Sequence, residues 1–141
     1  MKPAASKAAT PLREAWYYAL PSRRVGRREL VGKMMLGEPI LIGRDEAGGP
    51  FALRDLCPHR GMPLSAGHFD GREIECCYHG WRFDTHGQCT LIPSLVPGQS
   101  FSPGHIRTRR YPAHEIQGNV WVFFWRRPGN GTADPVSRRV R

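Results

Sequence analysis

Apolar and polar residues alternate over short stretches of this chain, and no stretch shows a sustained apolar period of 3.6 residues. The 16 glycines and 13 prolines are spread along the whole length, and both residue types interrupt helices. Short strands joined by turns are therefore expected, and long helices are not. With 141 residues the chain has the length of one domain, large enough for a modest core without disulfides. The pattern predicts an all-β fold.

Turn-forming residues predict where several strands begin and end. Residues 39–43 and 51–56 flank the acidic, glycine-containing segment 45–49, which predicts a hairpin. An Asp-Gly pair ending at Gly71 predicts a turn before a strand that leads to Cys76. These turns divide the first half of the chain into short antiparallel strands.

The second half of the chain contains one continuous apolar run, residues 120–125. A run without alternation is expected of a strand buried on both faces, so its aromatic side chains are predicted to lie in the core. Gly87 is predicted to turn the chain between residues 81–84 and 89–92. A long loop is predicted where three prolines follow one another, at Pro93, Pro97 and Pro103.

Candidate chemistry is concentrated in two half-motifs. Cys57 and His59 form a C-x-H pair, and after sixteen intervening residues Cys76 and His79 form a C-x-x-H pair. Each histidine is followed within two positions by a glycine, which lets backbone amides come close to an inorganic sulfide. Two thiolates on one iron and two imidazoles on the other are the ligands of a Rieske 2Fe-2S centre. Because imidazole is neutral, such a cluster accepts an electron more readily than an all-cysteine one. The spacing predicts electron transfer.

Zinc and disulfides are the alternatives for the same residues. Two cysteines and two histidines also form tetrahedral structural zinc sites, usually with C-x₂₋₄-C and H-x₃₋₅-H spacing. Here cysteine and histidine alternate within each half, which favours the iron–sulfur centre. Four cysteines in a short chain also suit a disulfide framework, but no secretory segment supports that interpretation.

The neighbouring residue Cys77 competes with Cys76 as a ligand. Charged and apolar residues alternate before this pair, so Ile74 and Cys76 are expected to point inward together. Only Cys76 keeps two residues before His79. Cys76 is therefore the predicted ligand, whereas Cys89 is predicted to be a small buried hydrophobic residue.

The segments CPHRGMPLSAG and CCYHGWRFDTHGQCTLIPS, which begin at Cys57 and Cys76, resemble the Rieske domain of ring-hydroxylating and O-demethylating non-haem iron oxygenases. The resemblance continues into the apolar run 120–125 and covers residues 14–126. It implies a Rieske-type antiparallel β-sandwich with a small cluster-binding subdomain of two loops, and a 2Fe-2S cofactor.

The resemblance also implies a role for each residue of the half-motifs. Cys57 and Cys76 would bind the inner iron, and His59 and His79 the outer iron near the surface. The remaining motif residues would surround the cluster or form the docking face for a partner: Arg60, Gly61, Tyr78, Gly80 and Trp81. Cys77 stands where this family commonly has proline, which leaves a thiol beside the cluster.

The resembling oxygenases have a second domain, in which two histidines and one carboxylate bind mononuclear iron. After Glu115 the only acid of this chain is Asp134. No closely spaced pair occurs among the other histidines, which are His68, His86, His105 and His114. No catalytic residue is therefore assigned, and oxygenase activity is not expected from this chain alone.

The function predicted from these residues is one-electron transfer within an oxygenase system. A reductase or ferredoxin would supply the electron, and a mononuclear iron site in an oxygenase catalytic domain outside this chain would receive it. Two other functions stay open. One is a free-standing Rieske ferredoxin that serves another enzyme, and the other is a zinc-stabilised binding module.

Charge and hydropathy exclude two other classes of partner. The formal net charge is +9, but residues 1–33 and 126–141 together carry +10 and the part between them −1. Basic ends without a basic stripe on the core argue against binding to nucleic acid. No apolar stretch reaches about 18 residues, so no membrane span is predicted. The predicted division is a basic tail at 1–13, a Rieske domain at 14–126 and a basic tail at 127–141. The expected location is the cytoplasm.

Overall fold

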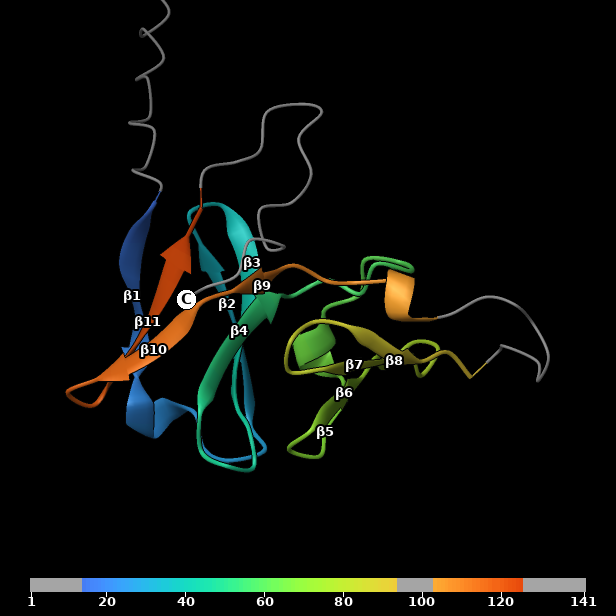
Figure 1. The fold of residues 1–141 in the computed structure, drawn as a ribbon, viewed down its shortest axis with the longest axis horizontal. Helices are drawn as coiled ribbons and strands as arrows, with labels where there is room; N and C mark the ends of the chain where they lie inside the picture. Colours follow the sequence, from blue (N-terminus) through green and yellow to red (C-terminus); the bar gives the residue numbers. More distant parts are fainter. Residues whose placement is uncertain (1–13, 94–102, 126–141) are drawn as a thin grey trace, which may run out of the picture.

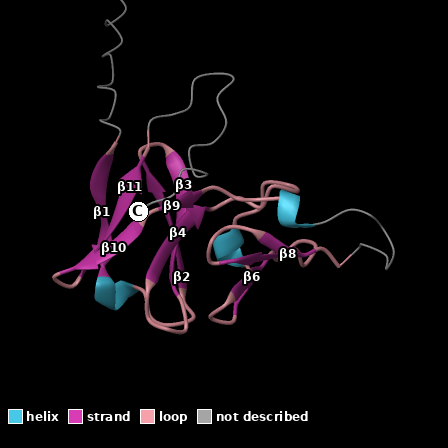
Figure 2. Cartoon of the chain, viewed as in Figure 1, coloured by secondary structure: helices cyan, strands magenta, loops and turns pink. Residues whose placement is uncertain are grey.

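The computed structural model describes residues 14–93 and 103–125. These residues form eleven short strands and three short 3₁₀ helices, and none of them lies in an α-helix (Figure 2). The all-β prediction is therefore confirmed. The two predicted tails and most of the predicted loop after Pro93 lie outside the described residues. No helix in the described part of the chain is long and apolar enough to cross a membrane.

Three antiparallel sheets follow one another across the molecule (Figure 1). The outer sheet of the sandwich has the order β1 (Ala15–Pro21), β11 (Asn119–Phe124), β10 (Ala113–Ile116). The central sheet has the order β2 (Leu30–Met35), β3 (Glu38–Arg44), β4 (Pro50–Arg54), β9 (Arg110–Tyr111). The third sheet has the order β5 (His68–Phe69), β6 (Glu73–Glu75), β7 (Arg82–Asp84), β8 (Cys89–Leu91). The 3₁₀ helices are η1 (Ser22–Arg24), η2 (Leu64–Ala66) and η3 (Pro103–His105).

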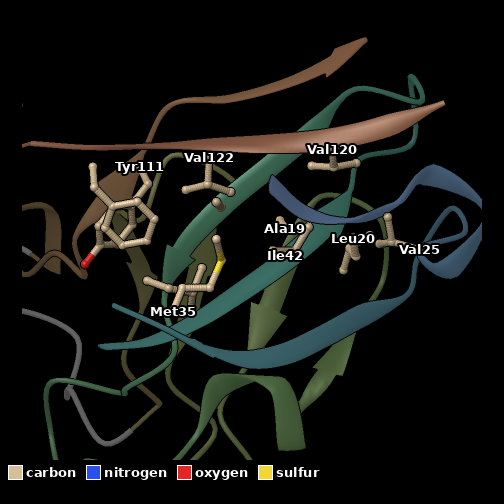
Figure 3. Close-up of a cluster of buried hydrophobic side chains, with 11 residues drawn as sticks. Ala19, Leu20, Val25, Met35, Ile42, Tyr111, Val120 and Val122 are labelled. Carbon is tan, nitrogen blue, oxygen red and sulfur yellow. The ribbon is translucent and has the colours of Figure 1, made fainter. Parts of the chain in front are cut away.

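The central sheet is buried on both faces because alternate side chains of its strands enter different cores. Ile40 and Ile42 of β3 point into the sandwich, and Leu41 between them points toward the third sheet. Figure 3 shows how the sandwich core fills the space between the outer and central sheets. Its labelled members are Ala19, Leu20, Val25, Met35, Ile42, Tyr111, Val120 and Val122.

A second core joins the central sheet to the third sheet. Its buried residues include Leu53 of β4, Ile74 of β6 and Phe83 of β7, none of which is exposed to solvent. Cys57 and Cys76 belong to the same cluster. The third sheet therefore packs onto the sandwich through the core that contains both thiols.

The predicted hairpin is confirmed, because β3 pairs with β4 in antiparallel register across the turn at residues 45–49. The predicted turns before β6 and between β7 and β8 are also present. β4 ends at Arg54, two residues before the predicted end. The backbone leaves the sheet there to form the first half-motif.

The prediction for residues 120–125 is wrong in one respect. β11 is buried on one face only: Val120, Val122 and Phe124 are buried, whereas Trp121 and Phe123 are half-buried on the other side. No sheet among the described residues covers that outer face. The aromatic side chains instead pack edge-to-face against their neighbours on β1. Hydrophobicity alone did not reveal this, because aromatic residues suit half-buried sheet surfaces as well as cores.

Candidate metal centre

The two half-motifs lie on two loops next to the third sheet. We call the sheet β5–β8 together with these loops the third-sheet region. The first loop connects β4 to η2 and holds Cys57 and His59. The second connects β6 to β7 and holds Cys76 and His79. The β6–β7 pairing brings the ends of the second loop together, and the shared core fixes the first loop beside it.

Both loops have the same backbone hydrogen bonds, although their Cys–His spacings differ. In the first loop the N–H of Cys57 donates to the carbonyl of Met62 at 2.7 Å, and the N–H of Gly61 donates to the carbonyl of Cys57 at 2.8 Å. In the second loop the equivalent bonds join Cys76 to Trp81 at 2.8 Å and Gly80 to Cys76 at 3.1 Å. The two loops are thus two copies of one turn.

The glycine of each turn has a backbone that other residues rarely adopt. Gly61 and Gly80 both have φ of +71°, in the left-handed region where a Cβ causes strain. The glycines after the two histidines are therefore required by the turn itself. From the sequence, these glycines were expected because they let backbone amides come close to a sulfide. The positive φ is a second reason why glycine occupies both positions.

The two thiols are buried and face one another. Cys57 is 2% exposed and Cys76 4% exposed, and their side chains lie within hydrogen-bonding range of each other. Burial raises the pKa of Cys57 to about 11, while the backbone N–H groups of His59 and Arg60 point at its sulfur and lower the pKa. Amide donors of this kind stabilise a thiolate. A metal ion bound to the sulfurs would remove the protons outright.

The two imidazoles lie on the solvent side of the thiols. His59 and His79 are exposed, and their Nδ1 atoms are 3.1 Å apart. Partial desolvation of the ring lowers the pKa of His59, and the nearby charges of His79 and Arg60 lower it further. Neutral imidazole is the form that binds metal.

Aromatic rings cover both histidines. The ring of Trp81 stacks on His59 with a centroid distance of 4.4 Å and an interplanar angle of 4°. The centroid of the Tyr78 ring lies 3.9 Å from the centroid of the His79 ring. Trp81 therefore joins the loops, because it follows one half-motif and packs on the histidine of the other. Tyr78 is 56% exposed and reaches the surface next to the histidines.

Two residues outside the half-motifs hold the loops in place, and neither was predicted from the spacing of motif residues. A Cβ at Gly67 would lie 1.9 Å from the carbonyl oxygen of Glu75, so only glycine fits beside the second loop. The hydroxyl of Thr108 donates to the carbonyls of Arg54 and Leu56 at 3.0 and 3.3 Å. Thr108 thereby ties the start of the first loop to the chain before β9.

The remaining cysteines lie where the sequence prediction placed them. Cys77 is exposed, and Cys89 is buried with 2% exposure. Burial raises the pKa of the Cys89 thiol, which agrees with a packing role. All four cysteines are free thiols.

The four side chains of the half-motifs form a sulfur pair and a nitrogen pair. A pair of thiolates suits one iron and a pair of imidazoles the other. The residues present therefore fit a [2Fe-2S] cluster.

Comparison with known proteins gives an independent result. The family model of the Rieske [2Fe-2S] domain matches residues 15–112. The oxygenase component of dicamba O-demethylase from Stenotrophomonas maltophilia is 35% identical over 127 residues, which cover 89% of this chain and 35% of that protein. The crystal structure of dicamba monooxygenase is similar with a TM-score of 0.73 and 32% identity, covering 94% of this chain and 40% of that one.

A further similar structure is the reduced complex between oxygenase and ferredoxin in carbazole 1,9a-dioxygenase. Its TM-score is 0.68 at 25% identity, with 82% of this chain and 30% of that chain covered. The chain thus spans less than half the length of each protein compared here.

Proposed function

The chain belongs to the Rieske [2Fe-2S] domain family, and from this premise we propose that it binds such a cluster and transfers single electrons. The proposed ligands are Cys57, Cys76, His59 and His79. One observation supports this assignment most strongly: a buried pair of thiols faces an exposed pair of imidazoles across two equivalent turns. When bound, the cluster supplies a one-electron couple with a higher potential than that of an all-cysteine cluster.

The protein's own residues would determine the side from which a redox partner approaches the cluster. The thiols are buried in the core of the third-sheet region. The histidine rings are exposed, and Trp81 and Tyr78 hold them in fixed orientations. Electrons would therefore enter and leave at the histidine edge. The adjacent Arg60, which is also exposed, adds positive charge to this edge.

The proposed partners are a reductase or ferredoxin as donor and an oxygenase catalytic domain with mononuclear iron as acceptor. Support comes from the similar proteins, which are oxygenases or oxygenase components, one of them in a complex with a ferredoxin. The shared part covers only 30 to 40% of those proteins. We place the acceptor iron outside the described residues and propose a cytoplasmic location, where free thiols stay reduced.

The test is to reconstitute the protein anaerobically with iron and sulfide. The expected result is about two irons and two acid-labile sulfides per chain, visible absorption, and an EPR signal after reduction with dithionite. One zinc per chain without sulfide would instead establish a zinc-stabilised module and refute the proposal.

A matched pair of variants tests the ligand assignment. Cys76→Ala should abolish the visible absorption, whereas Cys77→Ala should keep it, because only Cys76 is buried beside Cys57. The two cysteines are adjacent in the sequence, so the pair controls for the loss of a thiol from this loop. The reverse outcome would assign the ligand to Cys77.

A further inference from the structure

A cavity of about 480 Å³ opens beside the first loop and is lined by three arginines. Arg54 comes from the end of β4, and Arg107 and Arg109 come from the segment before β9. Cys57 and Gly61 of the first loop form part of its wall. No acidic side chain is among the described residues that line it. Three positive charges are therefore concentrated against the loop that holds half of the proposed cluster ligands.

The backbone fixes these arginines next to one another. The N–H of Arg54 donates to the carbonyl of Arg109 at 2.7 Å, and the hydroxyl of buried Thr108 donates to the carbonyl of Arg54. The strand end and the segment before β9 therefore run side by side. The backbone positions of these arginines cannot separate without breaking this pairing, so the local concentration of positive charge is built into the fold.

Two of the three guanidinium groups have no acidic partner in the described part of the chain. The salt bridges there involve Arg44, Arg72 and Arg82, each with glutamate. Arg54 and Arg107 take part in none of them, and both are exposed. Arg109 interacts with the Tyr111 side chain. Unpaired arginines around an open cavity provide planar, bidentate donors for carboxylates.

We propose that this arginine cavity receives carboxylate side chains of an acidic protein that donates electrons. The inference rests on the electron-transfer function proposed above. Because the wall of the cavity includes Cys57, a donor seated there lies against the loop that carries His59. One electron passes from the donor to the [2Fe-2S] centre, so the donor is oxidised by one electron and this protein is reduced by one. No bond forms or breaks.

A protein suits the cavity better than a small free anion. The cavity is open, and Thr108, the buried polar side chain among its described lining residues, donates its hydroxyl to backbone carbonyls. Exposed charges of one sign act mainly by steering a large, oppositely charged partner during diffusion, which raises the association rate and makes it sensitive to salt. We therefore expect the cavity to affect the rate of association with the donor and the salt dependence of that rate.

The experiment measures reduction of the cluster-containing protein by a reduced, acidic plant-type ferredoxin in an anaerobic stopped-flow instrument. At low ionic strength, Arg54→Gln/Arg107→Gln should lower the second-order rate constant on the order of tenfold and flatten its salt dependence. The control is Arg23→Gln/Arg24→Gln, which removes the same charge from exposed η1, far from the cluster loops (Figure 1). The control should change the rate constant less than about twofold.

Several outcomes would overturn the proposal. An unchanged rate in the cavity variant, or an equal loss in both variants, would show that the cavity does not recognise the donor. If the double variant fails to hold the cluster, Arg107→Glu alone decides, because that side chain is exposed and should still slow the reaction. Wild-type protein without acid-labile sulfide would refute the electron-transfer function itself, a result distinguishable before any rate is measured.

Discussion

Strands of five to seven residues form most of the β-sandwich, for example β1 and β3, whereas the strands of the third sheet have only two or three residues. The sandwich core is filled by its own side chains. The core of the third-sheet region instead ends in two buried thiols that face one another. The difference teaches that the first region is packed by its own side chains, while the second carries the side chains proposed to bind the cofactor.

The largest expected effect comes from a matched pair of core truncations. Phe124→Ala in the sandwich and Phe83→Ala in the third-sheet core each remove a fully buried ring, which costs about 3–5 kcal/mol of unfolding free energy. Phe124→Ala should keep the visible absorption of the folded protein, and Phe83→Ala should release iron faster. Urea unfolding followed by circular dichroism and by visible absorption measures both quantities. Equal rates of iron release from the two variants would contradict the distinction between a sandwich core and a cofactor-binding core.

Removal of the cluster should loosen only one of the two regions. In the protein without iron, amide exchange in β6 and β7 is expected to speed up on the order of 100-fold, because the bound centre contributes to the local folding free energy. Exchange in β3 and β11 should change little. Hydrogen–deuterium exchange with mass spectrometry measures each segment. A uniform increase across both regions would show that the sandwich also depends on the cofactor.

Gly67→Ala tests the close approach behind the second loop. The new Cβ would meet a backbone carbonyl at 1.9 Å, so the chain must move, at an expected cost of about 1–3 kcal/mol. Gly49→Ala is the control, since its Cβ would meet only the side chain of Asp45 at 3.3 Å. Thermal unfolding of both variants gives the difference. A control as damaging as Gly67→Ala would refute the steric argument.

The smallest expected effect concerns pH and the sandwich alone. Burial, together with the nearby carboxylate of Glu38, raises the pKa of Tyr111 to about 12. The Tyr111 hydroxyl donates a hydrogen bond to that carboxylate at 2.7 Å. The unfolded chain loses this proton near pH 10 and the folded protein only near pH 12. The contribution is therefore complete below pH 10 and is lost as the pH rises to 12.

Tyr111→Phe checks this sign. Below pH 10 the variant should be less stable by about 1 kcal/mol, the usual net value of one hydrogen bond. The difference from wild type should shrink between pH 10 and 12, and visible absorption should be unaffected. Urea unfolding at several pH values measures it. A difference that grows with pH would contradict the assignment.

The half-motifs, the turns and the all-β class were all predictable from the sequence, because each depends on residues close together in the chain. Glycine spacing predicts turns wherever the chain folds. The Cys–His pattern predicts a ligand set because iron accepts few side chains. The alternation around Ile74 predicted correctly which of the two adjacent cysteines is buried.

Only the tertiary structure decided which distant residues meet. The stacking of Trp81 on His59, the close fit at Gly67, the arginine cavity and the half-buried outer face of β11 all depend on how separate sheets and loops pack together. Local hydrophobicity and spacing contain no information on the distance between residues far apart in the chain. Those distances are set by the shared core between the central and third sheets.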